Sequence, residues 1–124
     1  MRIGELSARV GASERALRYY EQQGLLRPAR TDAGHRDYSE EDERTVRRIQ
    51  TLLAAGLGTS VIAELLPCTR DEGGIVAPAC AELVDDLRAE RDRIDAAIAE
   101  LARARDLLDA IIAAAPPAGA PACA

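Results

Sequence analysis

The chain lacks several residue types that most small domains contain. Among its 124 residues it has no Phe, no Trp and no Lys, a single His, and only three Tyr. No apolar run approaches the ~20 residues that a membrane-spanning helix needs, and the polar amphipathic pattern that follows Met1 and Arg2 is unlike a signal peptide. We therefore expect a cytoplasmic protein without membrane contact. At this length we expect one compact domain plus an appendage.

Cysteine is also scarce. Cys68, Cys80 and Cys123 are the three in the sequence, and none of them forms a Cys-x-x-Cys motif. In a reducing cytoplasm these thiols stay free, so no disulfide framework is expected. The cysteines have no catalytic His beside them, so the sequence gives little support to a thiol enzyme, and we expect no enzymatic activity.

The charge of the chain is segregated along the sequence. The formal net charge of −5 argues superficially against a nucleic-acid partner. However, residues 1–38 hold seven Arg against five acidic residues, whereas residues 70–124 hold six Arg against eleven. The acidic second half therefore conceals a locally basic N-terminal region.

The N-terminal third carries the most informative pattern. Apolar residues at helical spacing predict a helix over residues 2–10, which Gly11 ends. Ser13 is a typical N-cap for a second helix, which Gly24 ends. Two helices separated by so short a turn form a helix-turn-helix unit. The following segment, residues 27–38, is predicted to be a short β-hairpin that carries further arginines.

Two more helices are predicted before the middle of the chain. The residues from Ser39 to Asp42 resemble a capping box, and the apolar spacing that follows predicts a helix that ends at Gly56. A short fourth helix is expected over roughly residues 59–66. Residues 70–78 are expected to be a linker loop, within a stretch that Pro67 and Pro78 bound.

The last third is predicted to be a single long helix. Residues 79–114 contain no Gly or Pro and would span about 50 Å as a helix. Apolar residues recur every seven positions, and such a stripe needs a partner helix to cover it, most economically that of a second subunit. The residues expected to dimerise the chain are Leu83, Leu87, Ile94, Ile98, Leu101, Leu108 and Ile112. Residues 115–124 are expected to be a disordered tail.

The order of these parts, together with particular motifs, resembles the MerR family of bacterial transcription regulators. The motifs are Ile3-Gly4-Glu5-Leu6, Leu17-Arg18-Tyr19-Tyr20-Glu21, Gly24-Leu25-Leu26, Gly34-His35-Arg36 and the Tyr38 to Asp42 segment. The resemblance is close over about residues 1–66 and architectural beyond them. It implies a mainly α fold, with a winged helix-turn-helix DNA-binding domain over residues 1–69 and a dimerisation helix over residues 79–114.

In function, the resemblance implies a homodimer joined by an antiparallel coiled coil. Its two heads would bind a two-fold symmetric promoter site and distort the DNA, so that RNA polymerase can engage both of its recognition elements.

The resemblance also assigns DNA contacts. Arg18 and Tyr19 are expected at phosphates, and Arg15 at a base edge or a nearby phosphate; the opposing interpretation of Arg15 is a solvated charge paired with a neighbouring Glu. Tyr20 is equally compatible with core packing and with contact, and Tyr38 is expected to anchor the hairpin more than to touch DNA. The full predicted set is Ser13, Arg15, Arg18, Tyr19, Tyr20, Arg30, His35, Arg36 and Tyr38.

The controlling signal stays open at this level. Cys68 and Cys80 are candidates for a redox or electrophile switch, whereas a small buried hydrophobe is the opposing interpretation of Cys80. No complete metal site and no required cofactor are expected, and Cys80 and Cys123 are the only candidate metal ligands. Two alternatives remain: a metal- or ligand-responsive member of the same family, and a coiled coil that tethers another protein.

Overall fold

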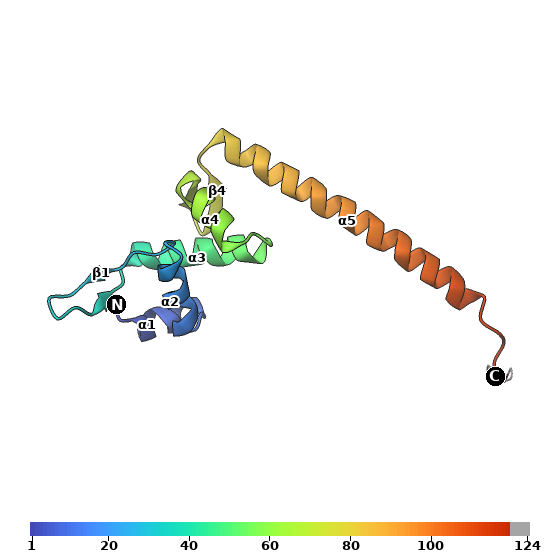
Figure 1. The fold of residues 1–124 in the computed structure, drawn as a ribbon, viewed down its shortest axis with the longest axis horizontal. Helices are drawn as coiled ribbons and strands as arrows, with labels where there is room; N and C mark the ends of the chain where they lie inside the picture. Colours follow the sequence, from blue (N-terminus) through green and yellow to red (C-terminus); the bar gives the residue numbers. More distant parts are fainter. Residues whose placement is uncertain (120–124) are drawn as a thin grey trace. The chain divides into compact units, whose positions relative to one another are not determined.

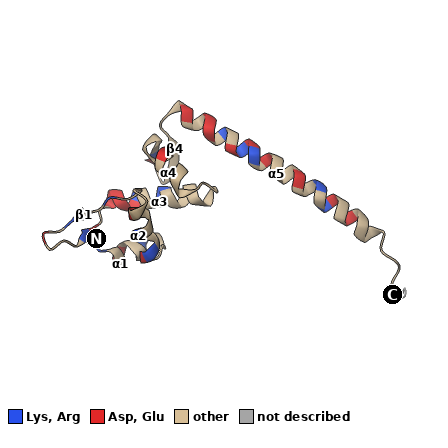
Figure 2. Ribbon diagram, in the orientation of Figure 1, with Lys and Arg blue, Asp and Glu red and all other residues tan. Residues whose placement is uncertain are grey.

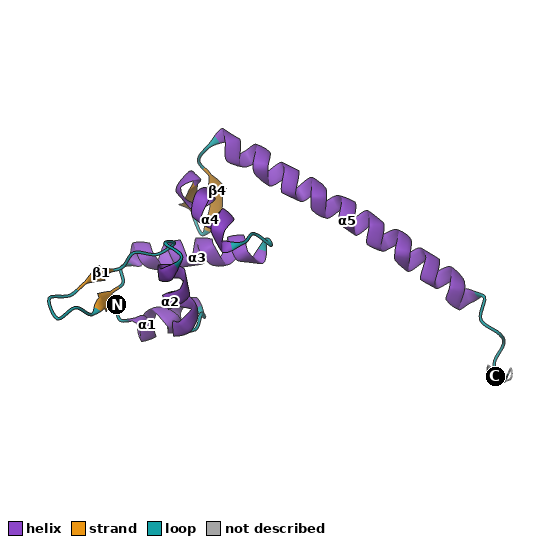
Figure 3. Cartoon of the chain, viewed as in Figure 1, coloured by secondary structure: helices purple, strands orange, loops and turns teal. Residues whose placement is uncertain are grey.

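A computed structural model describes residues 1–119 of the chain. The polypeptide forms two units, Met1–Leu83 and the segment from Val84 onward. The elements, shown in Figures 1 and 3, are α1 (Ile3–Val10), α2 (Glu14–Gln22), β1 (Ala29–Arg30), β2 (Arg36–Asp37), α3 (Glu40–Ala54), α4 (Thr59–Leu65), a 3-10 turn (Leu66–Cys68), β3 (Thr69–Glu72), β4 (Ile75–Pro78) and α5 (Ala81–Ala113). The fold is mainly α-helical, as the sequence predicts.

The first unit is built around one apolar core. Each of its four α-helices contributes the residues that recur at helical spacing, and the two strands of the first hairpin lead into the same core. Its buried members are Leu6, Val10, Leu17, Tyr20, Leu25, Leu26, Tyr38, Val46, Ile49, Leu52 and Ile62. With no Phe or Trp available, the two buried tyrosines are the largest side chains in this core.

The helix-turn-helix unit closes through local signals visible in the sequence. Gly11 ends α1 in the left-handed region at φ 69°, a conformation that favours glycine. The Ser13 hydroxyl accepts a hydrogen bond of 3.0 Å from the Ala16 N–H, which confirms it as the N-cap of α2. The Gln50 side chain on α3 donates to the carbonyl of Val10 at 2.8 Å. Helix α3 thereby satisfies an otherwise unpaired carbonyl at the end of α1.

The wing is the two-stranded antiparallel hairpin of β1 and β2, with Ala29 opposite Asp37 and Arg30 opposite Arg36. Its tip turns at Gly34, which lies at φ 81° and donates its N–H to the Thr31 carbonyl. The capping box predicted after the wing is present, because Ser39 and Asp42 exchange side-chain-to-backbone hydrogen bonds of 2.9 and 3.1 Å.

The structure corrects the expectation of a linker loop over residues 70–78. These residues belong to a second antiparallel hairpin, in which Thr69 lies opposite Pro78 and Glu72 opposite Ile75. Its two-residue turn is Gly73-Gly74, at φ 61° and 87°. Positive φ at both central positions suits a turn whose twist matches the flanking strands, and glycine adopts it without steric cost. The first compact unit accordingly extends past the expected boundary at residue 69 to Leu83.

Helix α5 runs over Ala81–Ala113, close to the predicted 79–114. Leu83 is only 3% exposed within a single chain, since the first turn of α5 lies in the compact unit that ends there. Its burial within one chain leaves little of its side chain for a second subunit. Leu87 is half-buried. The later members of the stripe are exposed: Ile94, Ile98, Leu101, Leu108 and Ile112, together with Leu107 and Ile111.

Residues 115–119 contain no helix or strand, and the remainder of the expected disordered tail, with Cys123, lies outside the described residues. Within the part of the chain that the structure describes, no helix combines the length and the apolar character that crossing a bilayer requires.

Candidate nucleic-acid interface

Helix α2 separates its side chains into an inner and an outer face. Leu17 is fully buried, and Tyr20 is 8% exposed, so both pack in the core. Arg15, Arg18 and Tyr19 are exposed on the same helix, and Tyr19 keeps 44% of its surface accessible. A short helix with two arginines and a tyrosine on its outer face offers cationic and hydrogen-bonding groups to phosphates and base edges.

The two arginines of α2 differ in their surroundings. Arg18 lies 3.8 Å from the Glu14 carboxylate, an exposed pair one helical turn apart. An exposed pair of this kind contributes little stability, ~0.3–0.5 kcal/mol, so a DNA phosphate can replace Glu14 as the partner of Arg18. Arg15 has no ion-pair partner among the described residues, because the adjacent Glu14 faces Arg18. The interpretation of Arg15 as one half of a surface ion pair therefore loses its support.

Glu21 joins the end of α2 to the wing. Its carboxylate accepts a hydrogen bond of 2.6 Å from Arg36 Nε, and its other oxygen lies 3.5 Å from Arg30. Glu21 is mostly buried, with 21% of its side chain accessible, so the pair is shielded from solvent on that side. Sequence reasoning gave Glu21 no role, and an interaction across fifteen positions has no local signature. The bridge fixes the orientation of the wing relative to α2.

Glu21→Gln is expected to loosen the wing. The amide keeps the shape of the carboxylate but removes the charge that holds two arginines. We expect the free energy of unfolding to fall by about 1 kcal/mol, because the pair is only partly shielded. Faster amide hydrogen exchange over residues 29–37, with exchange in α1 unchanged, is the measurement. Equal exchange rates over residues 29–37 in the unchanged protein and the variant would show that the wing keeps its position without Glu21.

The three tyrosines divide between surface and core. Tyr38 is 1% exposed, and its hydroxyl is buried without a hydrogen-bond partner among the described residues, so its ring packs in the core as expected of an anchor of the hairpin. Burial raises the pKa of Tyr38, with the negative charge of Glu21 as the next cause. Burial also raises the pKa of Tyr20, which favours the packing alternative for that ring. Both phenols stay protonated at neutral pH, and Tyr19 is the tyrosine that faces solvent.

The tip of the wing presents the remaining candidates. His35 is exposed, and its backbone N–H donates to the Thr31 hydroxyl at 3.2 Å. Arg30 is half-exposed and donates to the Gly34 carbonyl at 3.2 Å. Figure 2 shows basic residues on α2 and at the wing, whereas acidic residues mark the start of α3. The basic side chains predicted from the sequence thus gather on α2 and the adjacent wing.

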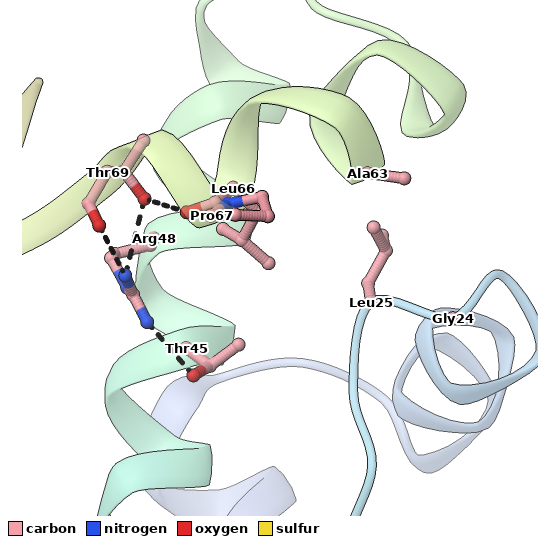
Figure 4. Close-up of a pocket in the computed structure, with 8 residues that line it drawn as sticks. All are labelled: Gly24, Leu25, Thr45, Arg48, Ala63, Leu66, Pro67 and Thr69. Atoms are coloured by element: carbon pink, nitrogen blue, oxygen red, sulfur yellow. Dashed lines mark hydrogen bonds between the residues drawn. The ribbon is translucent and has the colours of Figure 1, made fainter. Parts of the chain in front are cut away.

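A hollow of about 290 Å³ lies elsewhere in the first unit, among the end of α2, α3 and α4. Figure 4 shows Arg48 of α3 on one side of it, and Leu25 and Ala63 on the other side. Arg48 donates to the carbonyl and hydroxyl of Thr69 at 3.2 and 3.3 Å. These hydrogen bonds attach the start of β3 to α3, a contact that no sequence motif predicted.

Comparison with known proteins decides the family. A family model described as "MerR HTH family regulatory protein" matches residues 1–68, which include the helix-turn-helix unit and the wing. The chain belongs to the MerR family. It is a DNA-binding transcription regulator of that family, and the resemblance seen in the sequence is confirmed.

Among curated MerR-family relatives, "Heavy metal-dependent transcription regulator 2" of Rhizobium meliloti is 38% identical over 104 residues, 83% of this chain and 70% of the relative. The regulator HmrR of Rhizobium leguminosarum bv. viciae is 33% identical over 112 residues, 90% of this chain and 84% of the relative.

Two solved MerR-family structures are also similar. PbrR691 of Ralstonia metallidurans CH34, in complex with lead(II), is 26% identical with a TM-score of 0.74 and covers 97% of this chain and 91% of its own. HiNmlR, a MerR-family regulator that lacks the sensor domain and is bound to promoter DNA, is 25% identical with a TM-score of 0.59; it covers 90% of this chain and 86% of its own.

The cysteines of this MerR-family chain lie at one place in the described structure. Cys68 and Cys80 are both free and half-exposed; Cys68 precedes β3 and Cys80 follows β4, so both lie at the open end of the hairpin. Side-chain hydrogen bonding to Cys68 is the main cause that raises the pKa of Cys80. Across residues 1–119, no three His, Cys, Asp or Glu side chains gather as a metal-binding cluster. The candidate ligand Cys123 lies outside those residues.

Proposed function

We propose that the protein acts as a homodimer that binds a two-fold symmetric promoter site and distorts the DNA to control RNA polymerase engagement. The observation that carries the DNA contact is the outer face of α2, where Arg15, Arg18 and Tyr19 are exposed while Leu17 and Tyr20 fill the core. Arg36, Arg30 and His35 on the wing extend this surface. Ser13, the N-cap residue, lies at the N-terminal end of α2. The proposal includes no catalytic step and no required cofactor.

Dimerisation is proposed from the exposed stripe on α5. Ile98, Leu101 and Leu108 are 58%, 70% and 58% exposed in a single chain. Large aliphatic residues repeated over several helical turns are rarely left in water, because covering each gains ~1.5–3 kcal/mol. The acidic and basic residues that alternate along α5 in Figure 2 suit the flanks of such a seam. A second copy supplies the same stripe, and an antiparallel pair would cover both.

The test uses duplex DNA from the promoter beside the protein's own gene. DNase footprinting is expected to show a protected site with two-fold symmetry. Titration of the duplex with protein is expected to give a stoichiometry of one dimer per duplex. Circular-permutation electrophoresis is expected to show a bend, since distortion is the step that would act on polymerase. Binding of a single chain to each duplex, or the absence of binding at low salt, would contradict the proposal.

Metal dependence is the second candidate for the signal, and the names of the relatives favour it. One curated relative is called heavy metal-dependent, and one structural neighbour contains lead(II). A thiolate site in this chain would use Cys80 with Cys123, borrowed across a dimer. Run-off transcription with Cu(I), Zn(II) or Pb(II) added singly tests metal dependence. A metal-specific change in transcript that is lost in Cys123→Ser supports a metal signal. Equal transcript in all conditions excludes these ions as the signal.

A further inference from the structure

Two cysteines, far apart in sequence, meet at the base of the second hairpin. Cys68 is the last residue of the 3-10 turn before β3, and Cys80 immediately precedes α5. The Ala79 N–H donates to the Cys68 carbonyl at 2.7 Å, which continues the β3–β4 ladder one step beyond the pair of Thr69 and Pro78. In this register Cys68 lies opposite Ala79, and Cys80 is the next residue along the chain. The side chains of the two cysteines are hydrogen-bonded to each other, which places their sulfurs side by side at the base of the hairpin.

The thiols themselves are close and accessible. Cys68 is the main cause of the raised pKa of Cys80, as a hydrogen-bonding neighbour, with burial second. Both side chains are half-exposed, so a small reagent can reach them.

We propose that Cys68 and Cys80 form a reversible disulfide that closes the β3–β4 hairpin when a hydroperoxide oxidises the protein. The Cys68 thiolate attacks a peroxide oxygen, so that an S–O bond forms, the O–O bond breaks and the alcohol or water leaves. The Cys80 sulfur then attacks the sulfenic sulfur, the S–S bond forms and water leaves. Two thiols give up two electrons and two protons, and one hydroperoxide is reduced; a dithiol reverses the step.

The position of this pair connects it to the rest of the first unit. Thr69, next to Cys68, is 7% exposed and is held by Arg48 of α3. Cys80 accepts a hydrogen bond of 3.2 Å from the Leu83 N–H in the first turn of α5. A bond between the two sulfurs therefore fixes the segment that enters the long helix to the segment anchored on α3. Resting on the proposed function, we assign this bond as the means by which oxidation changes transcription at an occupied promoter.

The first arm of the test is chemical and needs no DNA. Full-length Cys123→Ser protein is treated with hydrogen peroxide, its free thiols are blocked, and it is digested with trypsin. Cleavage after Arg70 separates the two cysteines, so a disulfide appears as peptides 49–70 and 71–88 joined together. We expect that species, its loss after dithiothreitol, and its absence from Cys68→Ser and Cys80→Ser in the same background. Sulfinic or sulfonic acid at Cys68 instead, or a bond between subunits, would overturn the proposal.

The second arm measures regulation. Run-off transcription compares reduced and oxidised Cys123→Ser protein at saturating occupancy, with Cys68→Ser/Cys123→Ser as the control. We expect a change in transcript of about fivefold or more in the first and none in the second. A disulfide that forms without changing the transcript would refute its regulatory role. Absence of promoter binding in both redox states would instead refute the proposed function and leave the chemical result standing. Unchanged thermal melting of the serine variants shows that they fold.

Discussion

Leu101→Glu is expected to convert the dimer to monomers and to lower operator affinity by about 100-fold or more. Leu101 is 70% exposed in the single chain and lies in the middle of the α5 stripe. A two-fold interface repeats every substitution, so both the lost apolar burial and the buried charge count twice. At about 3 kcal/mol per copy, the dissociation constant of the dimer rises by roughly 10⁴-fold.

The DNA consequence follows from geometry. One head holds one half-site, and the second head then binds at the high effective concentration that the linked dimer provides. Loss of that linkage removes an avidity gain of ~10²–10⁴ without changing any protein–DNA contact. Light scattering should report twice the 13.3 kDa chain mass for the unchanged protein and a single chain mass for the variant.

Ala99→Glu is the matched control for this experiment. It adds the same charge to the exposed part of α5, but at a position on the far side of the helix from the heptad series. It should remain dimeric and bind the operator normally. The thermal melting of the first unit should be similar in both variants, since neither residue lies in its core. A Leu101→Glu protein that stays dimeric would show that the stripe is not the subunit interface.

The parts of the fold that the sequence predicted are those set by local chemistry. Ser13 at the start of α2 and the Ser39–Asp42 capping box are short-range hydrogen-bond patterns, and each recurs in the structure as predicted. Gly11 and Gly34 similarly mark turns at positive φ. Such signals depend on a few neighbouring residues, so they can be read without knowledge of the tertiary structure.

The second hairpin shows where local signals were misread. The linker loop expected over residues 70–78 contains Gly73-Gly74, and two consecutive glycines also suit a two-residue hairpin turn. The flanking strands gave little help, because Thr69–Glu72 is charged and Ile75–Pro78 ends in proline. Their pairing became visible only in three dimensions. The error concealed the closeness of Cys68 and Cys80, which the sequence left as a hypothesis.

The burial of Leu83 and Tyr38 depends on tertiary structure. Leu83 continues the heptad pattern and Tyr38 belongs to an arginine-rich segment, yet both are buried in the first unit. A sequence pattern identifies which residue types share a face, whereas burial depends on which element covers that face. The bridge from Glu21 to Arg36 is likewise a tertiary contact. The charge-bearing residues were predictable, and the contacts that orient them were not.

The combined variant Arg15→Ala/Arg18→Ala is expected to lower promoter affinity by about 10³-fold or more near physiological salt. A dimer loses four cations, and each released phosphate contact lowers the slope of log affinity against log salt by ~0.9. Both side chains are exposed, and neither contributes to the core, so the melting temperature should change little. Arg88→Ala/Arg93→Ala removes an equal charge from α5, where Arg93 pairs with Glu90, and should bind as the unchanged protein does.

The single variants separate the two predicted roles. Arg18→Ala should weaken binding equally on operator and on scrambled duplex, with a shallower salt dependence, because a phosphate contact carries no sequence information. Arg15→Ala should lose ~1–3 kcal/mol per half-site on the operator and less on scrambled DNA, since a bidentate arginine discriminates between bases. Fluorescence anisotropy on both duplexes, across a salt series, measures all four affinities. If Arg15→Ala weakened both duplexes equally, Arg15 would be a phosphate contact and base recognition would belong to another residue of the outer α2 face or the wing.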